Sequence, residues 1–122
     1  MRLLVTGSRT WTDRGLLQGV IGEVLWLGQL RPRDVLLIHG ACPWGADAMA
    51  DAFAREIGIR VRRHPADWAV HGKRAGFIRN AEMVSAGADL CMAFIRGGSP
   101  GASMTANLAQ RAGIPTEIYK EV

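Results

Sequence analysis

Cysteine, histidine and lysine are scarce in this sequence of 122 residues, and no apolar run approaches the length of a membrane span. Cys42 and Cys91 lie far apart, without His or Cys neighbours at metal-site spacing, so we expect no metal site and two small buried thiols in a reducing compartment. The apolar stretch at Met1–Val5 is too short for a signal peptide, and a bilayer span needs about 20 apolar residues. We therefore expect a soluble, cytoplasmic protein with no membrane partner.

The sequence also lacks charge blocks and low-complexity tracts, which argues against disorder. Its length of 122 residues and its 48% hydrophobic content suit one domain, residues 1–122, with a single site. The formal net charge of +4 favours anionic ligands and admits nucleic acid as a partner. Most of the basic residues are arginine, whose planar guanidinium suits phosphate oxygens.

Apolar runs typical of buried strands alternate with stretches of helical periodicity along the whole chain. This βαβαβαβαβ order predicts an α/β fold: a single Rossmann-like domain with a five-stranded parallel sheet, strand order 3-2-1-4-5, and helices on both faces. We expect strands at Leu3–Val5, Val35–His39, Ile59–Arg63, Asp89–Ile95 and Thr116–Tyr119, helices at about Thr12–Gly28, Asp47–Ile57, Ala75–Ala86 and Ala102–Ala112, and a loop at Pro65–Gly72.

Three glycine-rich segments each follow a predicted strand and lead toward a predicted helix: Gly7–Arg9, His39–Asp47 and Gly97–Ser103. In such a sheet they converge at the switch point between strands one and four, where ligands bind. Backbone N–H groups at a helix start attract anions. The pattern therefore predicts one phosphate-binding crevice. An alternative interpretation is that these glycines only form the turns that the fold requires.

Within this crevice, Arg9 is expected to clamp a phosphate with two hydrogen bonds, and the third segment to cradle a second anionic group with its N–H groups. Asp47 has two interpretations, as a helix cap or as a partner for sugar hydroxyls. The ligand-binding candidates are Gly7, Ser8, Arg9, Trp11, Gly40, Gly45, Ala46, Asp47, Arg79, Asn80, Gly98, Ser99, Gly101 and Ser103.

Three of the four tryptophans, Trp11, Trp44 and Trp68, fall in predicted loops, whereas Trp26 is assigned to the apolar face of the first helix. Loop tryptophans can stack on a base, and they also serve as lids on small cores or as contacts between copies. His39 ends a buried strand and is interpreted as a hydrogen-bonded core histidine.

Several short motifs occur together in this chain: Thr6–Arg9 with Trp11, His39-Gly40, Cys42-Pro43, Gly45–Asp47, Ala66–Trp68, Gly72-Lys73, Ala75-Gly76, Arg79-Asn80 and Met83. Together they resemble the YspA-like, cpYpsA-related branch of the SLOG superfamily over nearly the full chain. The resemblance implies kinship with the cytokinin-activating phosphoribohydrolases and with the DNA-processing protein that loads recombinase onto single strands. It implies a nucleotide or NAD-derived ligand, no required cofactor and a homo-oligomer, and it places Arg79 close to a substrate-binding position of the related hydrolases.

One departure from the related hydrolases concerns their Pro-Gly-Gly-x-Gly-Thr-x-x-Glu segment. Aligned on Gly101, this chain has Ala102 in place of the Thr and Thr105 in place of the Glu. Because glycosidic hydrolysis needs a carboxylate to activate water, this loss favours a protein that senses or sequesters a phosphorylated nucleotide-like molecule without turnover. Asp47 or Asp67 as a substitute acid keeps a nucleotide N-glycosidic hydrolase open, and the charge and loop tryptophans keep single-stranded nucleic-acid binding open.

Overall fold

Five strands form one parallel sheet in the computed structural model, which describes residues 1–122. The strand order is β3-β2-β1-β4-β5, which confirms the predicted arrangement. The strands are β1 (Arg2–Gly7), β2 (Leu36–His39), β3 (Arg60–Arg63), β4 (Leu90–Arg96) and β5 (Thr116–Glu121). The helices are α1 (Arg14–Leu27), α2 (Gly45–Ile57), α3 (Trp68–His71), α4 (Ala75–Ser85) and α5 (Pro100–Arg111), with short 3₁₀ turns η1 (Pro32–Asp34) and η2 (Gly72–Arg74).

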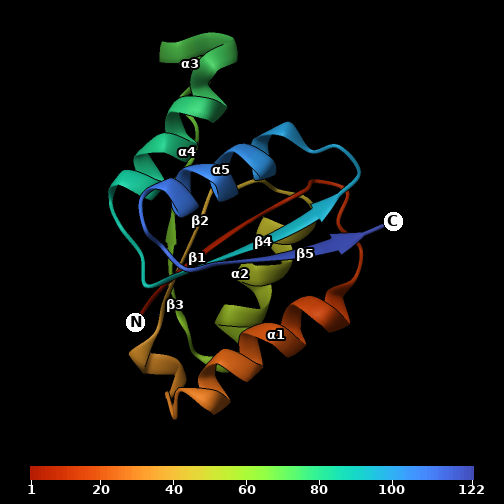
Figure 1. Cartoon of the computed structure of the whole chain (residues 1–122), viewed down its shortest axis with the longest axis vertical. Helices are drawn as coiled ribbons and strands as arrows, with labels where there is room; N and C mark the ends of the chain where they lie inside the picture. The colour runs from red at the N-terminus through yellow and green to blue at the C-terminus, as the bar shows by residue number, and fades with distance from the viewer.

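The sheet is the middle of three layers, with α1 and α2 on one face and α4 and α5 on the other (Figure 1). The central strands are apolar on both faces because both are covered. Alternate residues of β1 enter different cores: Leu3 and Val5 pack with the α1 and α2 side, whereas Leu4 packs with Met83 of α4 and Ala109 of α5. None of the helices is long and apolar enough to cross a membrane.

Helix α1 begins where Asp13 accepts a hydrogen bond from the Leu16 N–H at 3.0 Å, and it ends before Gly28, as predicted. Its buried stripe consists of Leu17, Ile21 and Leu25. The assignment of Trp26 to this stripe is wrong, because Trp26 follows Leu25 by 100° around the helix and its side chain is 82% exposed.

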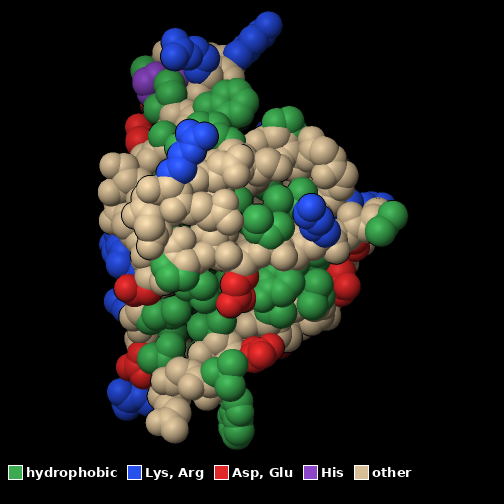
Figure 2. Space-filling model, in the orientation of Figure 1, with side chains coloured by type: hydrophobic (Ala, Val, Ile, Leu, Met, Phe, Trp, Pro, Cys, Tyr) green, Lys and Arg blue, Asp and Glu red, His purple; other side chains and the backbone are tan.

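The segment Pro65–Gly72, predicted as a loop, contains the short helix α3 and leads into η2. Asp67 begins α3 by accepting a hydrogen bond from the Val70 N–H at 3.1 Å. All residues from Asp67 to Arg74 are exposed, and α3 projects beyond α4 at one end of the molecule (Figure 1). Figure 2 shows Lys and Arg side chains gathered over this projecting end.

Candidate functional site

A crevice of about 900 Å³ opens beyond the carboxyl ends of β1 and β4, where the sheet topology predicts a ligand site. It is bounded by the segments that follow β1, β2 and β4 and by the first turns of α4 and α5. Ten of the predicted ligand-binding residues line it: Gly7, Ser8, Arg9, Gly40, Asp47, Arg79, Asn80, Gly98, Ser99 and Gly101.

The other four candidates, Trp11, Gly45, Ala46 and Ser103, do not line this crevice. Trp11 is 1% exposed, its ring meets the edge of Phe94 with 5.4 Å between ring centroids, and its Nε1 donates to the Asp13 carbonyl at 2.9 Å. It is therefore a core residue, in agreement with the alternative that a loop tryptophan covers a small core, and its place among the ligand-binding candidates is not supported. Ser103 lies on a separate pocket of about 300 Å³ on another side of the α5 start.

Two of the predicted phosphate-loop glycines are required by packing between β1 and the start of α2. A Cβ atom at Gly7 would lie 2.3 Å from the Ala46 Cβ and 2.7 Å from the Phe94 carbonyl oxygen. Gly45 has a φ of +65°, and a Cβ atom there would lie 2.2 Å from the Ser8 carbonyl oxygen. Both sites exclude any side chain, whether or not a ligand is bound.

Ser8 joins the ends of β1 and β4. Its hydroxyl accepts a hydrogen bond from the Arg96 N–H at 2.8 Å and donates to the Arg96 carbonyl at 3.3 Å. Its own carbonyl accepts from the N–H groups of Trp11 and Ala46, each at 3.2 Å. Ser8 thus ties three segments together beneath the crevice, and its hydroxyl is already engaged within the protein.

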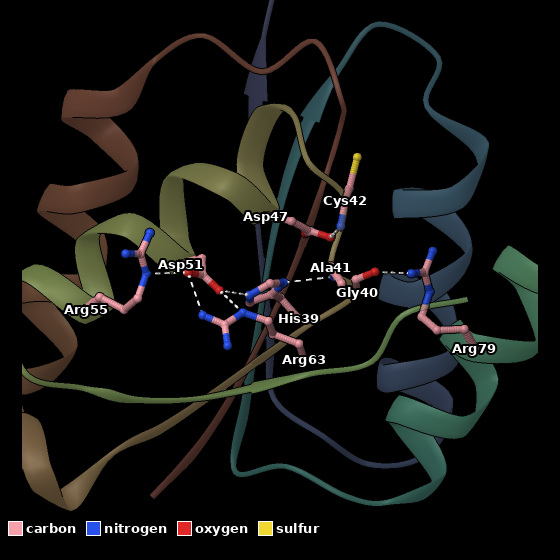
Figure 3. Close-up of polar contacts among 9 residues, drawn as sticks. All are labelled: His39, Gly40, Ala41, Cys42, Asp47, Asp51, Arg55, Arg63 and Arg79. Atoms are coloured by element: carbon pink, nitrogen blue, oxygen red, sulfur yellow. Dashed lines mark hydrogen bonds and ion pairs between the residues drawn. The ribbon is translucent and has the colours of Figure 1, made fainter. Parts of the chain in front are cut away.

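The wall after β2 is held by a hydrogen-bond network around two buried residues, His39 and Asp51 (Figure 3). The Asp51 carboxylate accepts hydrogen bonds from Arg55 Nε at 2.7 Å and from Arg63 Nε and Nη2 at 2.8 and 3.0 Å. It also lies 2.6 Å from His39 Nε2. Burial opposes ionisation of Asp51, but the hydrogen bonds from Arg63, Arg55 and His39 outweigh it and hold the pKa of Asp51 well below its usual range.

His39 connects this network to the backbone of the crevice wall. Its Nδ1 accepts a hydrogen bond from the Ala41 N–H at 2.9 Å, which places the ring proton on Nε2 as the donor to Asp51. Ala41 has a φ of +61°, a conformation unusual for a residue with a side chain. The histidine therefore holds the backbone at Ala41 in place, and its interpretation as a hydrogen-bonded core residue is confirmed.

Sequence reasoning missed Asp51, although one signal was present. Asp51 is buried on α2 with Ala50 and Ala54, and a carboxylate among buried alanines needs partners. Arg55 follows Asp51 by four residues, a spacing that indicates an ion pair on one face of a helix.

Arg79 and Asn80 connect the wall after β2 to the start of α5. Arg79 Nη1 donates to the carbonyls of Gly40 and His64, and its Nε donates to Asn80 Oδ1 at 2.7 Å. Asn80 Nδ2 donates in turn to the Gly101 carbonyl at 3.4 Å. Burial lowers the pKa of Arg79, and nearby Asp47 opposes that shift. Arg79 Nη2 has no hydrogen-bond partner in the protein and remains available at the crevice.

Asp47 is the one carboxylate that lines the crevice, and its residue is 7% exposed. Its Oδ2 accepts a hydrogen bond from the Cys42 N–H at 3.2 Å, so the side chain turns back toward the loop (Figure 3). Burial raises the pKa of Asp47, against the opposing effects of the Cys42 N–H and Arg79. Cys42 itself is partly exposed at the crevice, so its predicted burial is wrong, whereas Cys91 is buried as predicted.

Positive charge predominates around this carboxylate. Arg9, Lys73, Arg79 and Arg96 line the crevice, and none of them takes part in an ion pair within the chain. Arg96 donates from Nη1 to the Thr10 carbonyl at 2.9 Å, whereas Arg9 and Lys73 are exposed. The crevice thus has cationic groups available for an anion.

The third glycine segment leaves its backbone open to the crevice. A Cβ atom at Gly98 would meet no atom within 4 Å, and one at Gly101 would meet only Asn80 Nδ2, at 3.9 Å. Helix α5 starts at Pro100, and Ser99, which precedes it, makes no side-chain cap. The N–H groups of Gly101 and Ala102 belong to the first turn, where no helical carbonyl pairs with them.

Three exposed aromatic side chains complete the lining: Trp44 at 67%, Trp68 at 51% and Phe77 at 48% exposure. Thr105, in contrast, is fully buried, and its Oγ1 donates to the Gly101 carbonyl at 3.1 Å. The residue in the place of the hydrolase glutamate therefore takes no part in the crevice lining.

A five-stranded parallel sheet in this order, with helices on both faces and a crevice at its switch point, defines a Rossmann-like α/β domain. The model of the YspA, cpYpsA-related SLOG family matches residues 1–71, and the chain belongs to this family, which confirms the resemblance drawn from its motifs. Membership in the SLOG family points to nucleotide-related binding or processing.

Two further proteins are similar to this chain. The Gene 61 protein of Mycobacterium phage D29 is 44% identical over 119 residues, which cover 93% of this chain and 92% of the phage protein. Among solved structures, the C-terminal domain of a hydrogenase from Pyrococcus furiosus aligns with a TM-score of 0.46 and 18% identity, covering 96% of this chain and 89% of that chain.

Proposed function

We propose that this protein binds a nucleotide or a nucleotide-derived phosphorylated small molecule in the crevice beyond β1 and β4, and senses or sequesters it without turnover. The observation that carries the proposal is the combination of unpaired cations with open backbone N–H groups in one crevice. Arg9 and Lys73 have no ion-pair partner in the chain, and the start of α5 has no packing contact that would exclude a phosphate at Gly98.

Binding without cleavage is favoured by the carboxylates. Enzymes that cleave glycosidic bonds typically use two carboxyl groups, one on each side of the bond. Asp47 is the one carboxylate at this crevice, and Thr105 is bonded to its own helix. Asp47 is better suited to accept hydrogen bonds from sugar hydroxyls, because its burial leaves few competing water contacts.

The test is calorimetric titration with nucleoside monophosphates, NAD metabolites and cyclic nucleotides, followed by chromatography of the incubated mixtures. We expect saturable binding by at least one of these compounds and no release of free base. Arg9→Glu should weaken binding by about tenfold or more, because it replaces a charge-assisted hydrogen-bond donor by a repelling carboxylate. Arg60→Glu is the matched control, since Arg60 is exposed on β3 and lies outside the crevice.

An absence of binding by the whole panel would contradict the proposed function, and release of free base would contradict the absence of turnover. Single-stranded nucleic acid is a second candidate, favoured by the exposed Trp44 and Trp68 beside unpaired cations. Oligonucleotide binding that weakens steeply with added salt would favour this second function, because phosphate neutralisation releases counterions.

A further inference from the structure

We propose that Trp68, one of three exposed aromatic residues that line the crevice with Trp44 and Phe77, binds the base of the ligand by stacking. The ligand class is then a nucleoside phosphate with an intact aromatic base, in preference to a sugar phosphate or a phosphate alone. This inference rests on the proposed function, because it assigns the base of a ligand whose phosphate lies at the start of α5.

The four tryptophans have different environments, which separates structural roles from binding roles. Trp11 is 1% exposed in the core, and Trp26 is exposed on α1, outside the crevice. Trp44 and Trp68 are half-exposed or more, and both line the crevice although they come from separate segments, one after β2 and one after β3. Exposed aromatic groups collected at one concave surface are typical of a binding site rather than of scattered surface residues.

Trp68 is held in position before any ligand arrives. Asp67 caps the helix that begins at Trp68. The Trp68 ring lies over Gly76 of α4, where a Cβ atom would be 3.5 Å from Trp68 Cη2. The unpaired Nη2 of Arg79 lies beside the same glycine, 3.8 Å from that Cβ position. Because contact with α4 already restricts the Trp68 ring, the side chain loses less conformational entropy on binding. It therefore contributes more to affinity than an unrestricted side chain would.

The side chains around this ring determine what the site recognises. Lys73, Arg79, Phe77 and Ala66 line the crevice with Trp68 and carry no carboxylate or amide. The Asn80 amide and the Asp47 carboxylate of the same crevice already bond Arg79, Gly101 and the Cys42 N–H within the protein. Stacking is tolerant of base identity because every base has a π-face. We therefore expect the site to distinguish ligands by the presence of a base more than by which base it is.

The experiment compares AMP, ribose phosphate and inorganic phosphate by calorimetric titration of four proteins: the wild type, Trp68→Ala, Trp68→Phe and the control Trp26→Ala. We expect the wild type to bind AMP about tenfold or more tightly than ribose phosphate, as base stacking would provide. Trp68→Ala should remove this preference and leave ribose phosphate binding unchanged, whereas Trp68→Phe should keep most of it. Trp26→Ala should change neither affinity.

Equal affinities for AMP and ribose phosphate in the wild type, or an unchanged preference in Trp68→Ala, would overturn the inference while leaving the proposed function in place. A Trp68→Ala variant with a smaller mass in solution and an unchanged preference would overturn it in favour of a contact between copies. Failure of AMP to bind the wild type would also overturn the inference, and only failure of the whole panel of nucleotides and NAD metabolites would overturn the proposed function.

Discussion

The wall of the crevice that follows β2 and the wall that follows β4 both contain glycines, but the glycines have different causes. On the β2 side, a Cβ at Gly40 would lie 2.7 Å from Arg79 Nη1, and Gly45 is closed by the backbone of Ser8. On the β4 side, Gly98 has open space and Gly101 nearly so. The first wall is glycine-rich because the protein is densely packed there. On the second wall, Gly97 has a φ of +63° that favours glycine, whereas neither packing nor φ requires a glycine at positions 98 and 101. The phosphate that we propose to bind there would account for Gly98 and Gly101.

The same contrast applies to hydrogen bonding. The Ala41 N–H is fixed by His39, which is fixed by Asp51 and its arginines. On the β4 side, the Gly101 carbonyl accepts hydrogen bonds from the Asn80 and Thr105 side chains. The Ser103 N–H donates to the Ser99 carbonyl at 3.1 Å. The wall after β2 is fixed by hydrogen bonds, whereas the wall after β4 is open. A glycine-rich sequence by itself therefore does not identify the residues that contact phosphate.

The largest expected effect is the difference between adding a methyl group to a glycine of the wall after β2 and adding one to a glycine of the wall after β4. Gly45→Ala should lower the free energy of unfolding by about 3 kcal/mol or more, because the new Cβ overlaps the Ser8 carbonyl oxygen and the φ of +65° disfavours a side chain. Gly98→Ala should change it by less than about 1 kcal/mol, since its Cβ meets nothing. Urea unfolding of the two variants measures both values, and equal losses would break the comparison.

Asp51→Ala should have the next largest effect, a loss of about 2 kcal/mol at neutral pH, because His39 and Arg63 lose their buried acceptor. The pKa of Asp51 is lower in the folded protein than in the unfolded chain. Its ionised carboxylate therefore stabilises the fold at a pH above the unfolded-state pKa, and this stabilisation declines as the pH falls below about 4. Urea unfolding at neutral and acidic pH should show the difference from wild type narrowing in acid.

Glu56→Ala is the control for that experiment, because Glu56 lies on the same helix and is exposed. It should change stability little at either pH. A loss for Asp51→Ala that is as large in strong acid as at neutral pH would contradict the assigned ionic role.

Asp47→Asn should have the smallest effect, and in the opposite direction. Because the folded-state pKa of Asp47 is raised by burial, the ionised carboxylate destabilises the fold above about pH 4. Asparagine keeps an oxygen for the Cys42 N–H without the charge. Thermal unfolding should therefore show the variant to be the more stable protein at neutral pH and nearly equal to wild type in acid. Lower stability at neutral pH would show that the charge is needed by the fold.

The sequence predicted the sheet order and four of the five helices because apolar periodicity and helix-ending glycines are local signals. It failed where the determining contact is distant. Trp11 lies between β1 and α1 and has no periodic neighbours, and its burial depends on Phe94, which lies on β4. The helix α3 has only four residues, with one capping aspartate and no buried residue, so periodicity had nothing to detect.

The candidate crevice was predictable as a place, because topology brings the ends of β1 and β4 together. The roles of the crevice residues were harder to predict from the sequence. Ser8 was predicted to bind the ligand, and its hydroxyl instead bonds the backbone of Arg96, which is 88 residues away in the chain. Arg79 was expected to face a ligand, and most of its guanidinium instead supports Gly40, His64 and Asn80. Such contacts depend on side-chain packing between segments, which spacing along the chain does not encode.

The central claim is that the open wall after β4, and not the packed wall after β2, receives the phosphate. An amide NMR titration of the wild-type protein with ribose phosphate tests it most directly. The account predicts that the largest shifts fall on the N–H groups of Gly98, Ser99, Gly101 and Ala102, and that Gly7 and Gly45 move little. Large shifts confined to Gly40–Gly45, with the amides at the start of α5 unmoved, would contradict it.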